Sequence, residues 1–184
     1  MHWRILLLLI GTAALPALAA ERTLAVDEAH SRVEIDVKAT VDSFVGTLTH
    51  FTAAVRVDDA GMITQARFGF HFADVLTGKA KRDEKMHQWQ DTAHHPDGEF
   101  VLRALERAAD GRWLAHGRLR FHDIERPLDV PIAVTSDGSL LAIDGEAIVD
   151  TREFSLPVIR LLGLLKVDPR VAVRFHLQGN LAAR

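Results

Sequence analysis

Hydrophobic and polar residues alternate along most of the chain beyond residue 20. Side chains two apart in a strand share one face, so this pattern predicts half-buried β-strands. Nine segments carry the pattern: residues 23–27, 31–39, 51–58, 67–72, 99–106, 112–121, 127–134, 139–150 and 171–179.

Short turn sequences separate several of these segments. Asp-Gly pairs stand at 97–98, 110–111 and 137–138, and Asp59-Ala60-Gly61 is a slightly longer version. Asp-Gly supplies the positive φ that tight hairpin turns require. Strands joined in this way form an antiparallel meander, not βαβ units.

Glycines inside the alternating segments bear on how the sheet curves. Five of them interrupt the pattern, at positions 46, 69, 117, 145 and 179. Interior glycines often mark bulges or tight bends at barrel corners. We therefore expect an all-β fold, an eight-stranded antiparallel barrel, whose interior has room for one small ligand. A β-sandwich is the alternative.

One stretch, residues 79–93, breaks the two-residue period. It is rich in helix formers, Met86 and Trp89 are three apart, and Asp83 is able to cap the helix. Residues 94–96, His-His-Pro, would end it. The narrow apolar stripe predicts a short helix that lies over one end of the barrel as a lid or plug, with Met86 and Trp89 facing inward.

The segment RFGFHF, residues 67–72, places three phenylalanines on one face of a strand. With the inward residues of the other strands they form an almost uncharged wall. That wall encloses either a packed core or a hydrophobic pocket, and periodicity does not separate the two. The predicted wall comprises Val33, Ile35, Val37, Phe68, Phe70, Phe72, Phe100, Leu119, Phe121, Val130, Ile132, Phe154, Leu162, Leu164, Leu165 and Phe175.

The segment IRLLGLLKV, residues 159–167, favours the pocket. Its four leucines flank a glycine without alternating, which predicts a loop or irregular strand. Large apolar residues in a loop need cover. A barrel mouth lined by leucines would accept an acyl or prenyl chain, whereas the alternative is a plug folded over the core.

The amino terminus has the form of a secretory signal peptide at residues 1–19. MHWR is basic, ILLLLIGTAALP is apolar, and Ala17-Leu18-Ala19 is a small-x-small cleavage site. We therefore expect residues 20–184 to form a single domain in the bacterial periplasm. The chain has no cysteine, so no disulfide exists. The composition, 48% hydrophobic and 26% charged, is that of a globular protein.

Charge argues against a nucleic-acid partner. The formal net charge is −3, and the basic residues are scattered without a block that would follow a phosphate backbone.

Two groups of residues resemble reactive sites. Asp27, His30 and Ser31 are the residue types of a hydrolase triad, but neighbours on a strand point to opposite faces, and no Gly-x-Ser-x-Gly elbow exists. We expect no enzyme and no cofactor.

A periplasmic metal-binding protein is the second alternative. His87 and Asp91 are spaced i, i+4 on the predicted helix, and His94 and His95 follow. Imidazole and carboxylate suit zinc or copper, but the spacing matches no tight signature. We expect no metal site.

Several segments together resemble the YceI-like family. They are VDEAHSRVEIDVKA (26–39), FVGTLTHFTAAVRVDD (44–59), KAKRDEKM (79–86), Pro96 with EF (99–100), GRLRFHDIERPLDVP (117–131) and DTREFSLP (150–157). Each is weak alone, but they occur in the family's order and extend over about residues 22–180.

The resemblance implies an exported, lipocalin-like barrel with a hydrophobic pocket. Its expected ligand is an isoprenoid lipid of quinone or polyprenyl type. It also implies a homodimer and an accessory role in electron transfer, in which the carrier presents a quinone to a membrane cytochrome.

Overall fold

The computed structural model describes residues 21–161 and 165–182. The predicted signal peptide lies outside this part of the chain, as do Leu162 and Leu164. Among the described residues, no helix has both the length and the apolar character needed to span a membrane.

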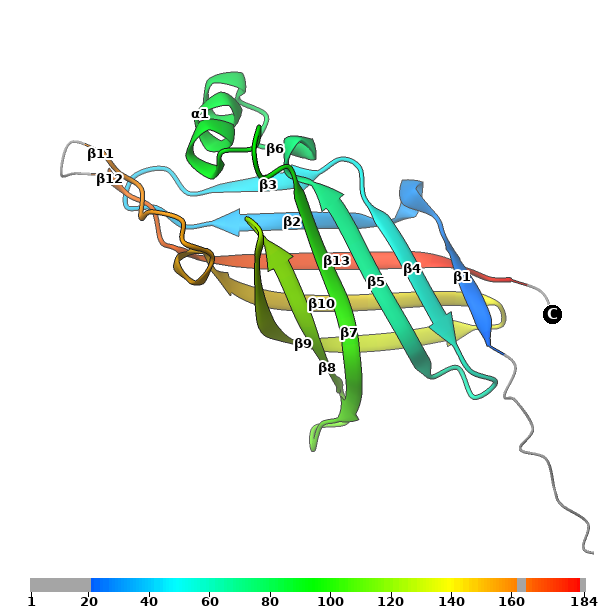
Figure 1. Cartoon of the computed structure of the whole chain (residues 1–184). Helices are drawn as coiled ribbons and strands as arrows, with labels where there is room; N and C mark the ends of the chain where they lie inside the picture. The colour runs from blue at the N-terminus through cyan, green and yellow to red at the C-terminus, as the bar shows by residue number, and fades with distance from the viewer. Residues whose placement is uncertain (1–20, 162–164, 183–184) are drawn as a thin grey trace, which may run out of the picture.

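Strands make up most of the described chain (Figure 1). They are β1 (Arg22–Val26), β2 (Arg32–Val37), β3 (Phe44–Leu48), β4 (Thr52–Val57), β5 (Ile63–His71), β6 (Val75–Leu76), β7 (Asp97–Arg107), β8 (Trp113–Phe121), β9 (Ile124–Asp137), β10 (Leu140–Asp150), β11 (Arg160–Leu161), β12 (Leu165–Lys166) and β13 (Arg170–Leu181). The helical elements are the 3₁₀ turns η1 (Glu28–His30), η2 (Phe72–Asp74) and η3 (Thr151–Phe154), and the α-helix α1 (Ala80–Gln90).

The main sheet closes into the predicted eight-stranded antiparallel barrel. Its order is β1-β4-β5-β7-β8-β9-β10-β13, and β1 also pairs with β13, which joins the two edges. β2, β3 and β6 extend the wall: β2 pairs with β13, β3 with β2, and β6 with β3. Because β1 has a partner on each side, the structure is not a sandwich.

The turn predictions were right in three places and wrong in one. Gly61, Gly111 and Gly138 have φ of 79°, 83° and 60° at turns between strands. The pair Asp97-Gly98 instead begins β7, opposite His71 and Phe70. Gly98 is required there for a steric reason, because a Cβ on it would lie 2.1 Å from the Phe70 ring.

Several strands differ from those that the alternation predicts. β3, a strand of five residues, was not among the nine predicted strands. β5 begins at Ile63, several residues before the predicted segment. The hairpin β11–β12 occupies the leucine segment, where the pattern predicts a loop or irregular strand.

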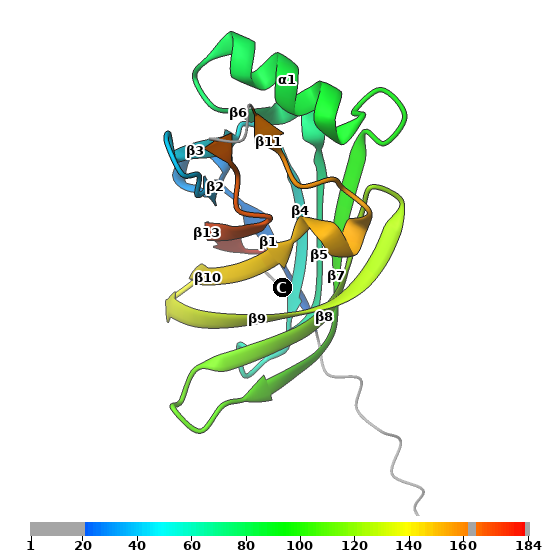
Figure 2. The ribbon, with the colours of Figure 1, turned by 90° about the vertical axis from the view of Figure 1, so that its left-hand side faces the viewer.

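The helix α1 lies over one end of the barrel, as predicted (Figures 1 and 2). It ends at Gln90, earlier than the His-His-Pro sequence predicts, because Asp91 takes the left-handed conformation with φ 55°. Asp83 does not cap it: its carboxylate accepts hydrogen bonds from the backbone N–H and hydroxyl of Thr77, at 2.9 and 2.5 Å.

The packed core lies towards the end of the barrel where β1 begins and β13 ends, away from α1 (Figure 1). Leu24, Val57, Leu141 and Leu181 belong to it, and each is no more than 7% exposed. This end of the barrel is therefore filled by side chains.

Candidate functional site: a hollow barrel interior

A cavity of about 910 Å³ occupies the barrel interior between the packed core and α1. Predicted wall residues border it from many strands: Val33, Ile35, Val37, Phe68, Phe70, Phe72, Phe100, Leu119, Phe121, Val130, Ile132 and Phe175. Met86 and Trp89 of α1 border it from above. The wall inferred from alternation therefore encloses a space and not a filled core.

The phenylalanine rings leave this space open because three of them lie over glycines on neighbouring strands. A Cβ on Gly98 would lie 2.1 Å from the Phe70 ring, one on Gly117 2.1 Å from Phe100, and one on Gly145 2.4 Å from Phe175. Each ring thus occupies the place of a missing side chain along the wall. Aromatic cover of a glycine on an adjacent strand also stabilises the pairing.

Small residues enlarge the cavity, and the sequence analysis missed them. Ala53, Ala66, Ala115 and Ala147 all border the cavity from strands. The signal was present, since Ala53, Ala115 and Ala147 occupy inward positions of alternating segments and Ala66 directly precedes one. Alanine at such positions takes less space than valine or leucine.

Phe154 was predicted as a wall residue, and this was wrong. It is 2% exposed, and it is not among the described residues that border the cavity. Its ring centroid lies 5.4 Å from that of Phe121, so it packs behind the wall. The reason is η3, which ends β10 and turns Phe154 into a second core cluster with Leu156. Leu165 pairs with Leu161 in the β11–β12 hairpin.

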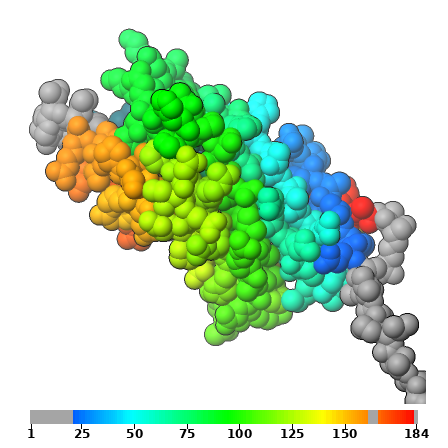
Figure 3. All heavy atoms as spheres, in the orientation of Figure 1, coloured from blue at the N-terminus to red at the C-terminus, as the bar shows by residue number. Residues whose placement is uncertain are grey.

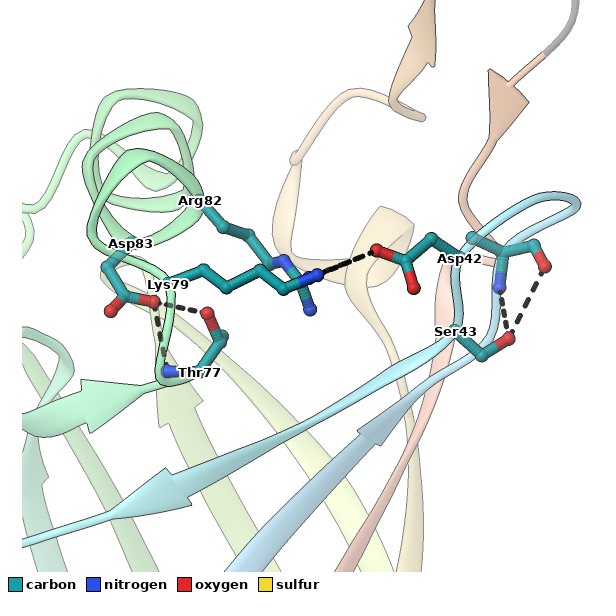
Figure 4. A network of polar contacts seen from close by, with 7 residues as sticks. Asp42, Ser43, Thr77, Lys79, Arg82 and Asp83 are labelled. Carbon is teal, nitrogen blue, oxygen red and sulfur yellow. Dashed lines mark hydrogen bonds and ion pairs between the residues drawn. The ribbon is translucent and has the colours of Figure 1, made fainter.

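Polar contacts hold α1 over the mouth of the cavity (Figure 4). Asp42, in the loop between β2 and β3, accepts from Lys79 at 3.4 Å and from Arg82 at 3.1 Å. The Arg82 guanidinium also stacks 4.2 Å above the centroid of the Phe44 ring. At the other end of the helix, the indole N–H of Trp89 donates to the Pro157 carbonyl at 2.8 Å.

The mouth is formed by α1 together with the segment that leads into β11. Figure 3 shows these two parts gathered at one end of the molecule, far from β1. The cavity is bordered there by Pro157, Val158 and Ile159, which precede β11, and by Val167, which follows β12. The mouth therefore combines apolar residues with the charged residues of the helix.

The histidines near the helix do not converge on a metal site. His87 contacts the Thr92 hydroxyl, His94 contacts Asp91 and His95 contacts Asp123. The hydrogen bond to Asp91 raises the pKa of His94. Within residues 21–161 and 165–182 there is no group of three or more metal-ligating side chains.

Asp27, His30 and Ser31 act as structural residues at the junction of β1 and β2. Asp27 caps η1 by accepting from the Ala29 N–H at 3.0 Å, and its other oxygen lies 2.8 Å from His30 Nδ1. Ser31 instead joins β13, where its hydroxyl oxygen accepts from the Gln178 N–H at 2.9 Å. Ser31 and His30 thus have separate partners.

The YceI-like domain model matches residues 24–179, which span the whole barrel. The chain belongs to the YceI-like family. This agrees with the resemblance found in the sequence segments. No curated protein matches the chain.

Solved structures share the fold of this YceI-like chain at low identity. Burkholderia cenocepacia BcnA has a TM-score of 0.75 and 22% identity, over 84% of this chain and 99% of that one. A polyisoprenoid-binding domain from Saccharophagus degradans has a TM-score of 0.63 and 14% identity, over 89% and 99%. The Campylobacter jejuni YceI protein has a TM-score of 0.64 and 15% identity, over 78% and 88%.

Proposed function

We propose that this protein is a periplasmic carrier that holds an apolar isoprenoid lipid, of quinone or polyprenyl type, inside its barrel. The observation that carries the proposal is the cavity of about 910 Å³ with its nearly continuous hydrophobic wall. Ligand pockets in proteins are typically about 300–1,000 Å³, mostly apolar and largely preformed.

The energetics of such binding need no charged group inside the barrel. Burying a methylene contributes about 0.8 kcal/mol, so a five-carbon isoprene unit contributes roughly 3–4 kcal/mol before losses. A few units offset the cost of immobilising the chain. Long apolar tails do not cross an aqueous compartment unaided. A protein that encloses the tail would allow the lipid to cross.

The comparisons support this ligand class and a binding role without catalysis. One structural neighbour is described as a polyisoprenoid-binding domain, and the proposal extends that chemistry to this chain. The periplasmic location rests on the signal-peptide pattern of residues 1–19. The expected homodimer and the membrane cytochrome partner stay predictions.

The test replaces a small residue of the cavity wall with a large one, which fills part of the cavity. Ala115 is 5% exposed and borders the cavity, so Ala115→Phe places a ring inside it. Ala133, on β9, is exposed and does not border the cavity, so Ala133→Phe adds the same ring outside. Delipidated protein is titrated with a prenylated benzoquinone while tryptophan fluorescence, including that of Trp89, is recorded.

We expect saturable quenching at micromolar or lower ligand in the parent protein and in Ala133→Phe. Ala115→Phe should weaken binding by about tenfold or more, which corresponds to roughly 1.4 kcal/mol. Circular dichroism confirms that both variants fold. A flat titration of the parent protein, or equal affinity in the two variants, would contradict the proposal.

A further inference from the structure

The mouth of the cavity carries more positive than negative charge, although the whole chain has a net charge of −3. Four cations of the α1 region border the cavity: Lys79, Lys81, Arg82 and Lys85. Arg160 of β11 borders it as well, and the acids that border it are Asp42 and Asp168. The excess of positive charge is thus concentrated where a ligand in the barrel would leave its polar end.

Two of these cations already have an ion-pair partner. Lys79 and Arg82 share the carboxylate of Asp42, as Figure 4 shows. Arg67, a further cation beside the cavity, pairs with Glu99 at 3.0 Å. These three cations have structural partners, so a ligand would bind them only if those ion pairs were broken.

The other three cations, Lys81, Lys85 and Arg160, differ from these paired ones. All three are exposed, and none has an ion-pair partner among the described residues. Lys81 and Lys85 are four apart in α1, so they lie on the same side of the helix. Three cations without an ion-pair partner among the described residues thus border the same cavity, and together they make a receptor for an anion.

The acids of α1 do not compensate these lysines. The Asp83 carboxylate is turned back to Thr77, and Glu84 accepts from the Gln88 amide at 3.3 Å. Neither acid is among the described residues that border the cavity. Asp168, which also borders the cavity, accepts from the Arg170 N–H at 2.9 Å.

We propose that Lys81, Lys85 and Arg160 bind the phosphate head group of an amphiphile whose apolar tail occupies the barrel. This rests on the proposed function and narrows its ligand class from neutral quinones to phosphorylated prenyl lipids. Lysine binds phosphate as a point charge, and arginine donates to two oxygens at once. The cations select the head group, and the hydrophobic wall supplies the affinity for the tail.

The experiment compares geranylgeranyl phosphate with geranylgeraniol, which has the same tail and no charge. Each is titrated against delipidated mature protein at low and high salt. The test variant is Lys81→Gln/Lys85→Gln, with Arg160→Gln separately. The matched control is Lys38→Gln/Arg103→Gln, because those exposed cations have no ion pair among the described residues and do not border the cavity.

The phosphate should bind more tightly than the alcohol, and high salt should reduce that preference because exposed charges are screened. Lys81→Gln/Lys85→Gln should weaken phosphate binding by about three- to tenfold, the value for two exposed charge contacts, and leave alcohol binding unchanged. Arg160→Gln should act in the same direction, and the control should bind as the parent protein does.

Three results would overturn this head-group site and leave the carrier function standing. One is equal affinity for phosphate and alcohol. A second is an unchanged preference for the phosphate in the test variants, when the same variants no longer sediment with anionic phospholipid vesicles. That result would show that the cations bind a membrane surface. Binding of inorganic phosphate as tight as that of geranylgeranyl phosphate would also overturn it. Failure of both prenyl ligands to bind would instead refute the carrier function itself.

Discussion

At the scale of single residues, the hollow depends on glycines that lie beneath phenylalanines. Gly145 pairs directly with Phe175 across β10 and β13, and the ring occupies the space of the missing side chain. The alternation of β13 placed Phe175 on the inner face. Whether its ring projects into the centre or lies along the wall is decided by its cross-strand neighbour.

The substitution Gly145→Ala tests this arrangement. The added Cβ would lie 2.4 Å from the Phe175 ring, so the ring must move into the cavity. We expect the free energy of unfolding, measured by urea denaturation, to fall by about 1–3 kcal/mol, the usual cost of overpacking. The affinity for a prenylated quinone should fall as well.

Gly69→Ala provides the comparison. A Cβ there meets only the Thr52 hydroxyl, which is able to rotate away. We expect this variant to be as stable as the parent protein or more so, because alanine reduces the entropy of the unfolded chain. Equal destabilisation by the two substitutions would show that strand glycines matter for another reason.

At the scale of elements, α1 is a polar helix held in place by a few directed contacts. Its cavity side offers Met86 and Trp89, and its amino-terminal half is held by Asp42. A helix with so little apolar surface gains less from burial than the strands do. Its position over the mouth therefore depends strongly on ion pairs and on the Trp89 hydrogen bond.

The substitution Asp42→Asn should loosen the helix from the mouth. It removes the charge shared by Lys79 and Arg82, and exposed pairs contribute about 0.2–1 kcal/mol each. We expect amide hydrogen exchange in α1 to become about two- to tenfold faster, with exchange in β8 and β9 unchanged. Asp137→Asn, in the β9–β10 hairpin, is the control. Unaltered exchange in α1 would mean that Asp42 does not hold the helix.

At the scale of the whole molecule, pairs of histidine and carboxylate are distributed over the exterior. In the described part of the chain, the histidines within 4 Å of a carboxylate are His30, His50, His71, His94, His95, His116 and His176. His116 has two such partners: its Nδ1 lies 2.8 Å from Asp129 and its Nε2 3.3 Å from Glu106. Neutral imidazole has only one N–H, so two carboxylates favour the charged ring, and the pKa of His116 is raised.

The contribution of His116 to stability should therefore decrease between about pH 6 and about pH 8. A raised folded-state pKa means that the folded protein holds the proton more tightly than the unfolded chain. That contribution is fully present below the ordinary histidine value of 6.5 and is lost as pH rises through the folded-state pKa. His94 contributes in the same direction through Asp91.

Urea denaturation at both ends of this range measures the effect. His116→Gln should reduce the decrease in stability between the two pH values, whereas Arg103→Gln, a non-titrating exposed position, should leave it unchanged. If stability decreases by the same amount in His116→Gln as in the parent protein, the contacts of His116 with Asp129 and Glu106 are not the source of the decrease.

The carboxylates act at low pH. Arg152 lowers the pKa of Asp150, and the contribution of this pair to stability is lost as pH falls below about 3.8.

The sequence by itself determined which residues face inward, where most strands run and that one short helix interrupts them. These follow from local geometry, because a period of two assigns each side chain to a face whatever the partner strand. The resemblance of its segments also identified the family. Phe154 lies beyond the last residue of the alternating segment 139–150, where η3 turns its side chain into a core cluster and no local pattern predicts its direction.

Only the tertiary structure decided that the interior is hollow and that cations surround its mouth. The hollow requires closure of β1 on β13 and a register that places Gly98 and Gly145 beside phenylalanines from other strands. The mouth brings Asp42, Lys85 and Arg160 together from three separate parts of the chain. Neither feature is encoded in a local pattern, because both depend on which strands become neighbours.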